Sequence, residues 1–268
     1  MNILESFKMA TATLVANKMR SSLTMLGIVI GNASVIAMVG VGEGAKNLAS
    51  EQFESLGPNV IFVVPGTQEE RRTTFNLPKT LVWADAIAIK EQVPTISEVA
   101  PQITANQLIS YRNRNGNEQV LGTTPEYLTV RSFEVERGRF FNDFDVKRNR
   151  RVVVLGSEIA DKFFAQQNPI WKKIRVKNIN LEVIGVLESK GSFLGQNQDL
   201  TVYVPLTTMA NQIVGNKSPY GTQVSFISFA AYDEYSIRAA KLQIENLLRL
   251  RHQITGEDDF SVQTQKDV

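Results

Sequence analysis

Two groups of residues in this sequence of 268 have types and spacings that could do chemistry. The first is the segment GVGEGAK at residues 40–46, whose glycines and lysine resemble a loop that binds phosphate. A Walker A loop, however, follows a strand and has Ser or Thr directly after its lysine. Here an apolar run precedes the glycines, and Asn47 follows Lys46. The segment therefore does not predict nucleotide binding.

The second is His252, the only histidine, through which any Ser-His-Asp triad would have to be built. It follows Arg249 and Arg251 at the end of an amphipathic stretch, where basic side chains suit the helix dipole. We therefore predict a solvated helix end there. The carboxylates are scattered without metal-ligand spacing. The sequence predicts no enzyme, no metal and no cofactor.

Composition excludes further classes of protein. There is no cysteine, so disulfides, zinc–thiolate sites and cysteine nucleophiles are impossible. The 29 Lys and Arg residues against 27 Asp and Glu give a net charge of +2, which excludes a strongly basic protein that binds nucleic acid. The charge is unevenly placed, because the whole excess lies within the first 20 residues and the rest is neutral.

An uncharged run of 22 residues, SSLTMLGIVIGNASVIAMVGVG, covers residues 21–42. As a helix it would span about 33 Å, enough to cross a hydrocarbon core of about 30 Å. A secretory signal peptide is the alternative, but it has a shorter apolar run after a shorter leader. We predict a retained transmembrane helix. The basic residues lie before it, so the positive-inside rule places the N-terminus in the cytoplasm and residues 43–268 in the periplasm.

Within this run, Gly27 and Gly31 form a GxxxG motif, which lets a second helix approach closely. The alternative is that glycine is simply common in membrane helices. Asn32 lies near mid-span, where a carboxamide is costly unless it is bonded, so it also suggests a helix partner. We predict helix packing in the membrane at these three residues. Residues 1–20 are predicted to form an amphipathic helix on the cytoplasmic membrane face, or else an extension of the span.

The remainder reads as an α+β domain. Its first part has a helix over residues 43–56, a strand over 59–64, a loop over 67–80, a helix over 83–93 and an extended segment over 96–105. A β-rich middle follows, with a hairpin whose turn is expected at Asn115 and Gly116, and a helix over 158–167 capped by Ser157. The chain then returns to a strand over 223–230, a helix over 235–252 and a strand over 259–263. We therefore predict an outer unit of residues 43–106 and 215–268, with residues 107–214 inserted in it.

These segments carry a family resemblance. Its most specific motif is NKMRSSLTMLGIVIG at residues 17–31, and weaker motifs follow in order: LGPN at 56–59, GRF at 138–140, VVVLG at 152–156, VIGV at 183–186 and VYVP at 202–205. The sequence resembles the N-terminal part of a MacB-type ABC transporter permease, in the DevC-like form. One departure is Trp171, where the family commonly has glycine, so the turn there must avoid a positive φ or tolerate it at a cost.

The resemblance implies a bacterial inner-membrane permease subunit, in which the outer unit is the porter-like and the inserted unit the sabre-like subdomain. It implies several partners: a cytoplasmic ABC ATPase on a separate polypeptide, a second permease copy, a periplasmic adaptor, an outer-membrane TolC-like channel and membrane lipids. The amphipathic helix, with Phe7, Lys8, Lys18 and Arg20, would face the ATPase. ATP hydrolysis would then drive periplasmic movement and export.

Other members of the wider superfamily share this topology. An FtsX-like regulator or a lipoprotein-releasing permease is the alternative function. Binding to a periplasmic adaptor would favour the exporter over these alternatives. The family has four spans, so we expect this chain to lack the later three and not to transport substrate alone. The substrate itself cannot be read from these segments.

Overall fold

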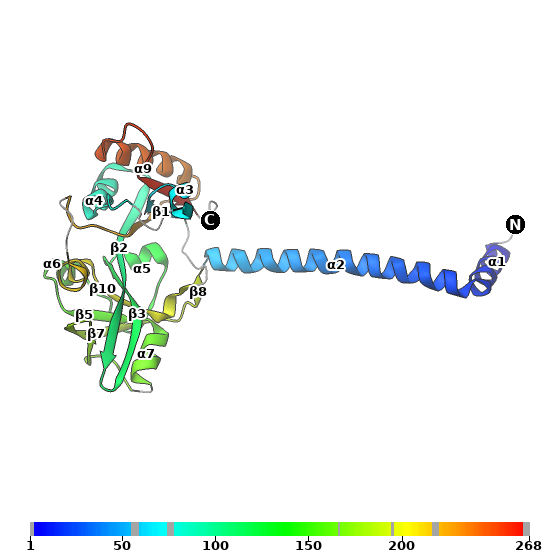
Figure 1. Ribbon diagram of the computed structural model, residues 1–268, viewed down its shortest axis with the longest axis horizontal. Helices are drawn as coiled ribbons and strands as arrows, with labels where there is room; N and C mark the ends of the chain where they lie inside the picture. The colour runs from blue at the N-terminus through cyan, green and yellow to red at the C-terminus, as the bar shows by residue number, and fades with distance from the viewer. Residues whose placement is uncertain are drawn as a thin grey trace. The chain divides into compact units, whose positions relative to one another are not determined.

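The computed structural model describes residues 3–54, 59–73, 78–165, 167–193, 196–215 and 220–264. Contacts divide the chain into a first unit, Met1–Glu51, and a second, Gln52–Val268. The first unit holds α1 (Ile3–Ala16) and all but the last three residues of α2 (Lys18–Glu54), with Asn17 between the two helices (Figure 1). The candidate span, Lys18–Gly44, lies within α2, so the predicted span and the helix predicted after it form one helix. The end of that second prediction, residues 55 and 56, is outside the described residues.

The outer part of the second unit contains a split β-α-β fold. Its elements are β1 (Val60–Pro65), α4 (Trp83–Gln92), β2 (Ile96–Tyr111), β11 (Phe226–Ala231), α9 (Ile237–Arg251) and β12 (Phe260–Thr264). The strand order is β12-β1-β11-β2, and all neighbours are antiparallel. This is the ferredoxin-like arrangement of two β-α-β repeats. The strands and helices predicted at both ends of the domain are therefore confirmed.

A second group of elements is inserted between β2 and β11. It comprises β3 (Arg114–Thr123), α5 (Tyr127–Arg131), β4 (Val135–Gly138), α6 (Asp143–Lys147), β5 (Val152–Leu155), α7 (Ser157–Phe164), β6 (Lys173–Val176), β7 (Ile179–Leu187), β8 (Ser192–Phe193), β9 (Gln196–Asn197), η1 (Gln198–Leu200), β10 (Thr201–Pro205), α8 (Leu206–Thr208) and η2 (Met209–Val214). The sheet continues β2-β3-β10-β5-β7-β4, and β6 pairs with both β7 and β2. The pairing through β6 closes a ring of strands. The α+β class with a β-rich insertion is thus confirmed.

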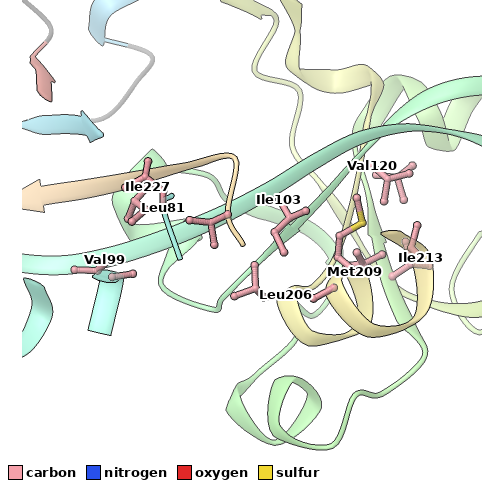
Figure 2. Close-up of a cluster of buried hydrophobic side chains, with 14 of the residues drawn as sticks. Leu81, Val99, Ile103, Val120, Leu206, Met209, Ile213 and Ile227 are labelled. Atoms are coloured by element: carbon pink, nitrogen blue, oxygen red, sulfur yellow. The ribbon is translucent and has the colours of Figure 1, made fainter. Parts of the chain in front are cut away.

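Strand β2 belongs to both groups. Its residues 96–102 pair with β11, and its residues 103–111 pair with β3 (Figure 1). Figure 2 shows Ile103 of β2 between side chains of the outer part, such as Ile227, and side chains of the insertion, such as Met209. One apolar core therefore runs through both groups. The division predicted between residues 106 and 107 falls inside this strand.

The β2–β3 turn differs from the prediction. Tyr111 pairs with Arg114, so the turn consists of Arg112, with φ 51°, and Asn113. Asn115 and Gly116, the predicted turn, lie within β3 instead. The physical reason is register. With this pairing Ile109, Tyr111 and Val120 point into the core, and a slip of one residue would expose them.

Two other local predictions were wrong. Residues 67–80 do not form a plain loop, because α3 (Gln68–Thr73) begins there; residues 74–77 are outside the described residues. Thr67 and Glu70 cap it reciprocally: each backbone N–H donates to the other side chain, at 2.9 and 3.2 Å. Ser157 is the first helical residue of α7 rather than its N-cap, which is Gly156. A Cβ at Gly156 would lie 2.4 Å from the Asp199 carbonyl oxygen, so no serine could cap from that position.

Trp171, which stands where the family commonly has glycine, adopts a positive φ. Its φ is 67°, so the turn keeps the left-handed backbone without a glycine. Its N–H donates to the Val183 carbonyl at 2.8 Å, and its indole is 70% exposed. Because the residue is mostly exposed, packing does not oppose this conformation, and the backbone hydrogen bond helps to hold it.

Candidate functional site

The residues predicted to pack in the membrane lie on the exposed surface of α2. The span window in the single chain is not buried at all, and a Cβ at Gly27 or Gly31 would meet nothing within 4 Å. Thr24 and Ser34 share the glycine face, and their hydroxyls donate to carbonyls within the helix, for example Ser34 to Ile30 at 2.8 Å. This face is therefore flat and open to a second helix, and its hydroxyl groups already have hydrogen-bond acceptors within α2.

Asn32 points elsewhere. Each helical residue advances by about 100°, so Asn32 lies roughly 100° from Gly31 and roughly 140° from Gly27 around the axis. Its side chain is exposed in the single chain. The three residues predicted as one packing site thus occupy two faces, and a single helix neighbour would not cover both.

The four residues predicted to face the ATPase do not share one helix. Phe7 and Lys8 lie on α1, where Phe7 is 71% exposed, whereas Lys18 and Arg20 lie in the first turn of α2. The prediction of one helix over residues 1–20 is therefore wrong. Asn17 ends the first helix in a turn. Cations at a helix N-terminus oppose the helix dipole, so Lys18 and Arg20 do not serve the stability of α2.

The segment that resembles a phosphate loop, residues 40–46, is part of α2 and helical throughout. It follows the apolar part of the same helix and not a strand. Among the residues that the structure describes, no group of His, Cys, Asp and Glu could hold a metal ion.

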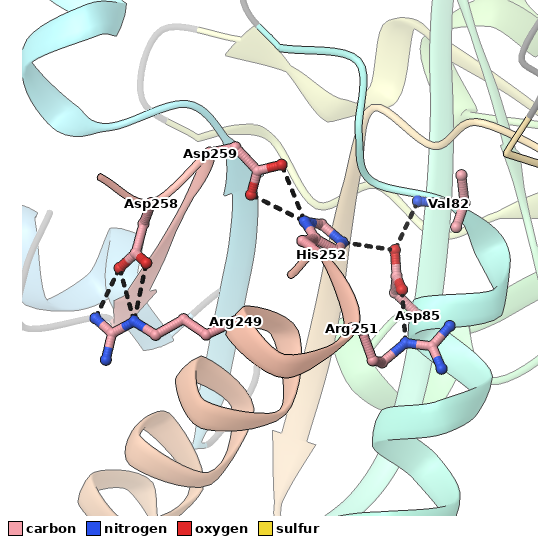
Figure 3. Close-up of polar contacts among 7 residues, drawn as sticks. All are labelled: Val82, Asp85, Arg249, Arg251, His252, Asp258 and Asp259. Atoms are coloured by element: carbon pink, nitrogen blue, oxygen red, sulfur yellow. Dashed lines mark hydrogen bonds and ion pairs between the residues drawn. The ribbon is translucent and has the colours of Figure 1, made fainter. Parts of the chain in front are cut away.

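The second unit carries a charged cluster around His252 in which Asp85 and His252 are buried and Arg251 and Asp259 are partly exposed (Figure 3). His252 Nδ1 lies 2.9 Å from Asp259 Oδ1, and Nε2 lies 3.2 Å from Asp85 Oδ2. Asp85 also accepts from Arg251 Nε at 2.8 Å and from the Val82 N–H at 2.9 Å. These four side chains, called the brace below, join α4, the end of α9 and the start of β12. The brace is neutral overall, with two cations and two anions.

Burial and pairing set the protonation state of the brace. Burial alone would raise the pKa of Asp85, but hydrogen bonds from His252, Val82 and Arg251 outweigh it and hold that pKa below its ordinary value. The hydrogen bond to Asp85 raises the pKa of His252 against the opposing effect of burial, and Asp259 adds to the rise. Both imidazole nitrogens face carboxylate oxygens, so the pairing favours the cationic ring, in which both nitrogens are N–H donors.

The helix end at His252 was predicted to be solvated, and this is wrong. His252 is indeed the residue that ends α9, but its side chain is only 9% exposed. No local signal could have revealed this, because Asp85 is 167 residues away in sequence. Its imidazole lies between two carboxylates, which raise its pKa, and this arrangement suits a structural role.

Comparison with known proteins places this geometry in a family. The model of the MacB-like periplasmic core domain matches residues 21–247. The chain belongs to this family. Among curated relatives, the macrolide export ATP-binding/permease protein MacB of Neisseria gonorrhoeae is 34% identical over 256 residues, which cover 96% of this chain and 38% of the relative. The MacB of Shewanella sp. is 33% identical over 97% of this chain and 39% of the relative. The chain thus spans about two fifths of the length of these relatives.

Solved structures agree on the fold. The periplasmic region of MacB from Actinobacillus actinomycetemcomitans matches with a TM-score of 0.67 at 23% identity, over 80% of this chain and 92% of that one. The extracellular domain of the ABC-type transporter YknZ from Gram-positive bacteria matches with a TM-score of 0.61 at 20% identity, over 77% of this chain and all of that one. The chain is therefore a MacB-like periplasmic core domain of an ABC permease, joined to one apolar helix long enough to span a membrane.

The brace makes the stability of this MacB-like domain depend on pH. The pKa of His252 is raised on folding, so its stabilisation is complete below about pH 6.5 and is lost as pH rises through the folded-state pKa. We expect the free energy of unfolding to fall by up to about 1.4 kcal/mol per pH unit just above pH 6.5. Denaturant unfolding of the whole chain between pH 6 and 7.5 measures it.

The matched variant is His252→Gln, which should remove this slope. The pH range stays below 7.5 because burial lowers the pKa of Lys190 to about 8, and a lysine with a lowered pKa adds stability as pH rises above that value. An equal slope in His252→Gln and in the parent chain would contradict the assignment.

Proposed function

We propose that this chain is the anchored periplasmic part of a permease in an ABC exporter, and that it converts ATP-driven movement at the membrane into movement of its periplasmic domain. The observation that carries the proposal is α2, a single helix of 37 residues that contains the candidate span and runs on beyond it. It is about 56 Å long against a hydrocarbon core of about 30 Å. Such a helix can carry a displacement out of the bilayer.

The N-terminal residues are the proposed input. The excess positive charge at Lys8, Lys18 and Arg20 favours a cytoplasmic location, and Lys18 and Arg20 stand at a helix end where they oppose the dipole. Exposed Phe7 on α1 offers an apolar contact beside these charges. We propose that these residues meet lipid headgroups and a cytoplasmic ABC ATPase on a separate polypeptide.

The domain is the proposed output. Strand β2 runs through both groups of elements without a break, and one apolar core joins them. A displacement applied to one group therefore reaches the other without an intervening hinge in this strand. We propose that the group around β1, β11 and β12 is the porter-like part and the strand ring the sabre-like part, and that a periplasmic adaptor and an outer-membrane TolC-like channel receive the movement.

A topology test can refute this scheme, because it requires α1 and the domain on opposite sides of the membrane. The sequence has no cysteine, so single cysteines can be introduced without interference. In spheroplasts that express the whole chain, a membrane-impermeant maleimide should label Lys172→Cys, because position 172 is exposed and lies directly before β6. It should label Lys8→Cys only after permeabilisation.

The control is the same pair of variants in permeabilised cells, where both positions should react. Labelling of position 8 in intact spheroplasts, or protection of position 172, would exclude a cytoplasmic ATPase contact and with it the proposed function.

A further inference from the structure

A cavity of about 370 Å³ lies where the outer strands meet the inserted group. Its walls come from β1, β2, β3, β10, β11, β12, α5 and the segment around η1. The described residues that line it are Phe62, Val64, Gln102, Thr104, Gln119, Leu121, Tyr127, Arg131, Asn197, Gln198, Thr201, Tyr203, Phe226 and Gln263. This volume falls within the range of small-molecule sites. None of these residues was singled out by the sequence.

The wall of this cavity holds an unusual set of unpaired polar atoms. Gln102 Oε1, Thr104 Oγ1, Arg131 Nε and Gln198 Nε2 are all buried and have no hydrogen-bond partner. Gln102 is fully buried and Arg131 is 7% exposed. Buried polar atoms in proteins are nearly always paired, since each unpaired one costs about 1–3 kcal/mol. Half of the eight such atoms found among the described residues gather around this one cavity.

The described residues of the cavity wall carry positive charge and no negative charge. Among the described residues that line the cavity, Arg131 is the only charged one and none is a carboxylate. Its guanidinium stacks over the Phe62 ring at 5.4 Å and donates from Nη2 to Gln198 Oε1 at 3.2 Å. Among the described residues Arg131 has no ion-pair partner within 4.0 Å. The cavity therefore presents a buried cation without a counter-ion, which favours an anionic guest.

The rest of the wall combines amides, hydroxyls and aromatic rings. The unpaired atoms include donors (Arg131 Nε, Gln198 Nε2) and acceptors (Gln102 Oε1, Thr104 Oγ1). A bound molecule with hydroxyl groups can accept hydrogen bonds from these donors and donate hydrogen bonds to these acceptors. The rings of Tyr127 and Tyr203 lie 5.6 Å apart and, with Phe62, supply apolar surface. A C–H face of a guest can pack against such surface.

We propose that this cavity is a binding site for a small hydroxylated organic acid with one apolar face, of which a sugar acid is the simplest form. The acid group pairs with Arg131, hydroxyl groups meet Gln102, Thr104 and Gln198, and the apolar face packs on the aromatic side chains. The inference goes beyond the proposed function and does not depend on it. Binding can be measured without an ATPase or an adaptor.

The test is calorimetric titration of the whole chain in detergent with D-glucuronate, beside glucose and acetate. Glucuronate should bind, and each of the other two should bind at least about tenfold more weakly, because glucose lacks the acid and acetate lacks the hydroxyls. Equal binding of glucose or acetate, or no binding of glucuronate at millimolar concentration, would overturn the proposal. The last result would leave water as the occupant.

Variants locate the site. Arg131→Met should weaken glucuronate binding at least about tenfold, which is about 1.4 kcal/mol, and Arg131→Lys should lose less because it keeps the charge. Thr104→Phe fills the cavity while it removes an unpaired hydroxyl, so it should abolish binding even if Arg131→Met fails to fold. Its control is Ser110→Phe, on the same strand but outside the cavity. Wild-type affinity in a folded Thr104→Phe protein would refute the site.

The same chemistry could come from a free sugar acid or from a lipid headgroup. Titration in phosphatidylcholine nanodiscs with and without glucuronosyl diacylglycerol distinguishes the two sources. A fall in the apparent affinity for free glucuronate when the lipid is present supports a headgroup as the occupant. An unchanged affinity supports a soluble acid at the same site.

Discussion

Replacement of Asp85 by alanine should lower the free energy of unfolding of the MacB-like domain by about 3 kcal/mol or more. Asp85 is 1% exposed, and its carboxylate accepts hydrogen bonds from His252, Arg251 and the Val82 N–H. Its removal leaves the buried His252 cation with one partner instead of two. It also removes the acceptor of the N–H of Val82, the N-cap of α4. Both losses act in the folded state only.

The control for this prediction is Asp258→Ala. It removes a carboxylate from Arg249, also on α9, but that pair is exposed, with Arg249 47% accessible. An exposed pair contributes less than about 1 kcal/mol. Urea unfolding of the whole chain, followed by circular dichroism at pH 6, compares the two variants. Equal losses in both, or a loss below about 1 kcal/mol in Asp85→Ala, would show that the brace does not hold these elements together.

Leucine at Gly27 and Gly31 should weaken self-association of the chain in a membrane by roughly tenfold, about 1.4 kcal/mol. The glycine face is flat and open in the single chain, and two leucine side chains would hold a second helix away from the backbone. Energy transfer between labelled chains in proteoliposomes measures the association. This prediction tests the contact with a second permease copy that the family resemblance implies.

Two further variants sharpen it. Val29→Leu also enlarges a side chain, but it lies roughly 160° from either glycine around the helix and should change little. Asn32→Leu tests the other face, which a different neighbour would contact. If Gly27→Leu with Gly31→Leu associates as tightly as the parent chain, the GxxxG motif reflects only the commonness of glycine in membrane helices.

Much of the fold could be predicted because its signals are local. The apolar run at residues 21–42 and the amphipathic pattern of α9 each lie within one continuous segment. The repeat of strand, helix and strand at both ends of the domain indicated the inserted arrangement. The missed α3 also had a local signal, the capping box at Thr67 and Glu70.

The misses with no local signal concern contacts between distant segments. An Asn-Gly pair favours a turn by its own backbone preference, yet Asn115 and Gly116 became part of a strand because core side chains set the register. His252 matched an exposed helix end by its neighbours in sequence, but the fold buries it against Asp85. Local preference is worth a few tenths to about 1 kcal/mol, and burial of a core side chain is worth more.

The sequence by itself determined the family, the membrane-spanning length of the apolar run and the order of the elements, since these depend on composition and periodicity along the chain. Only the tertiary structure decided which polar groups from distant segments lie together. The brace joins residues 85 and 252, and the cavity gathers Gln102, Arg131 and Gln198 from three separate elements. The pairing of these polar groups depends on a shared loss of water, which no segment experiences alone.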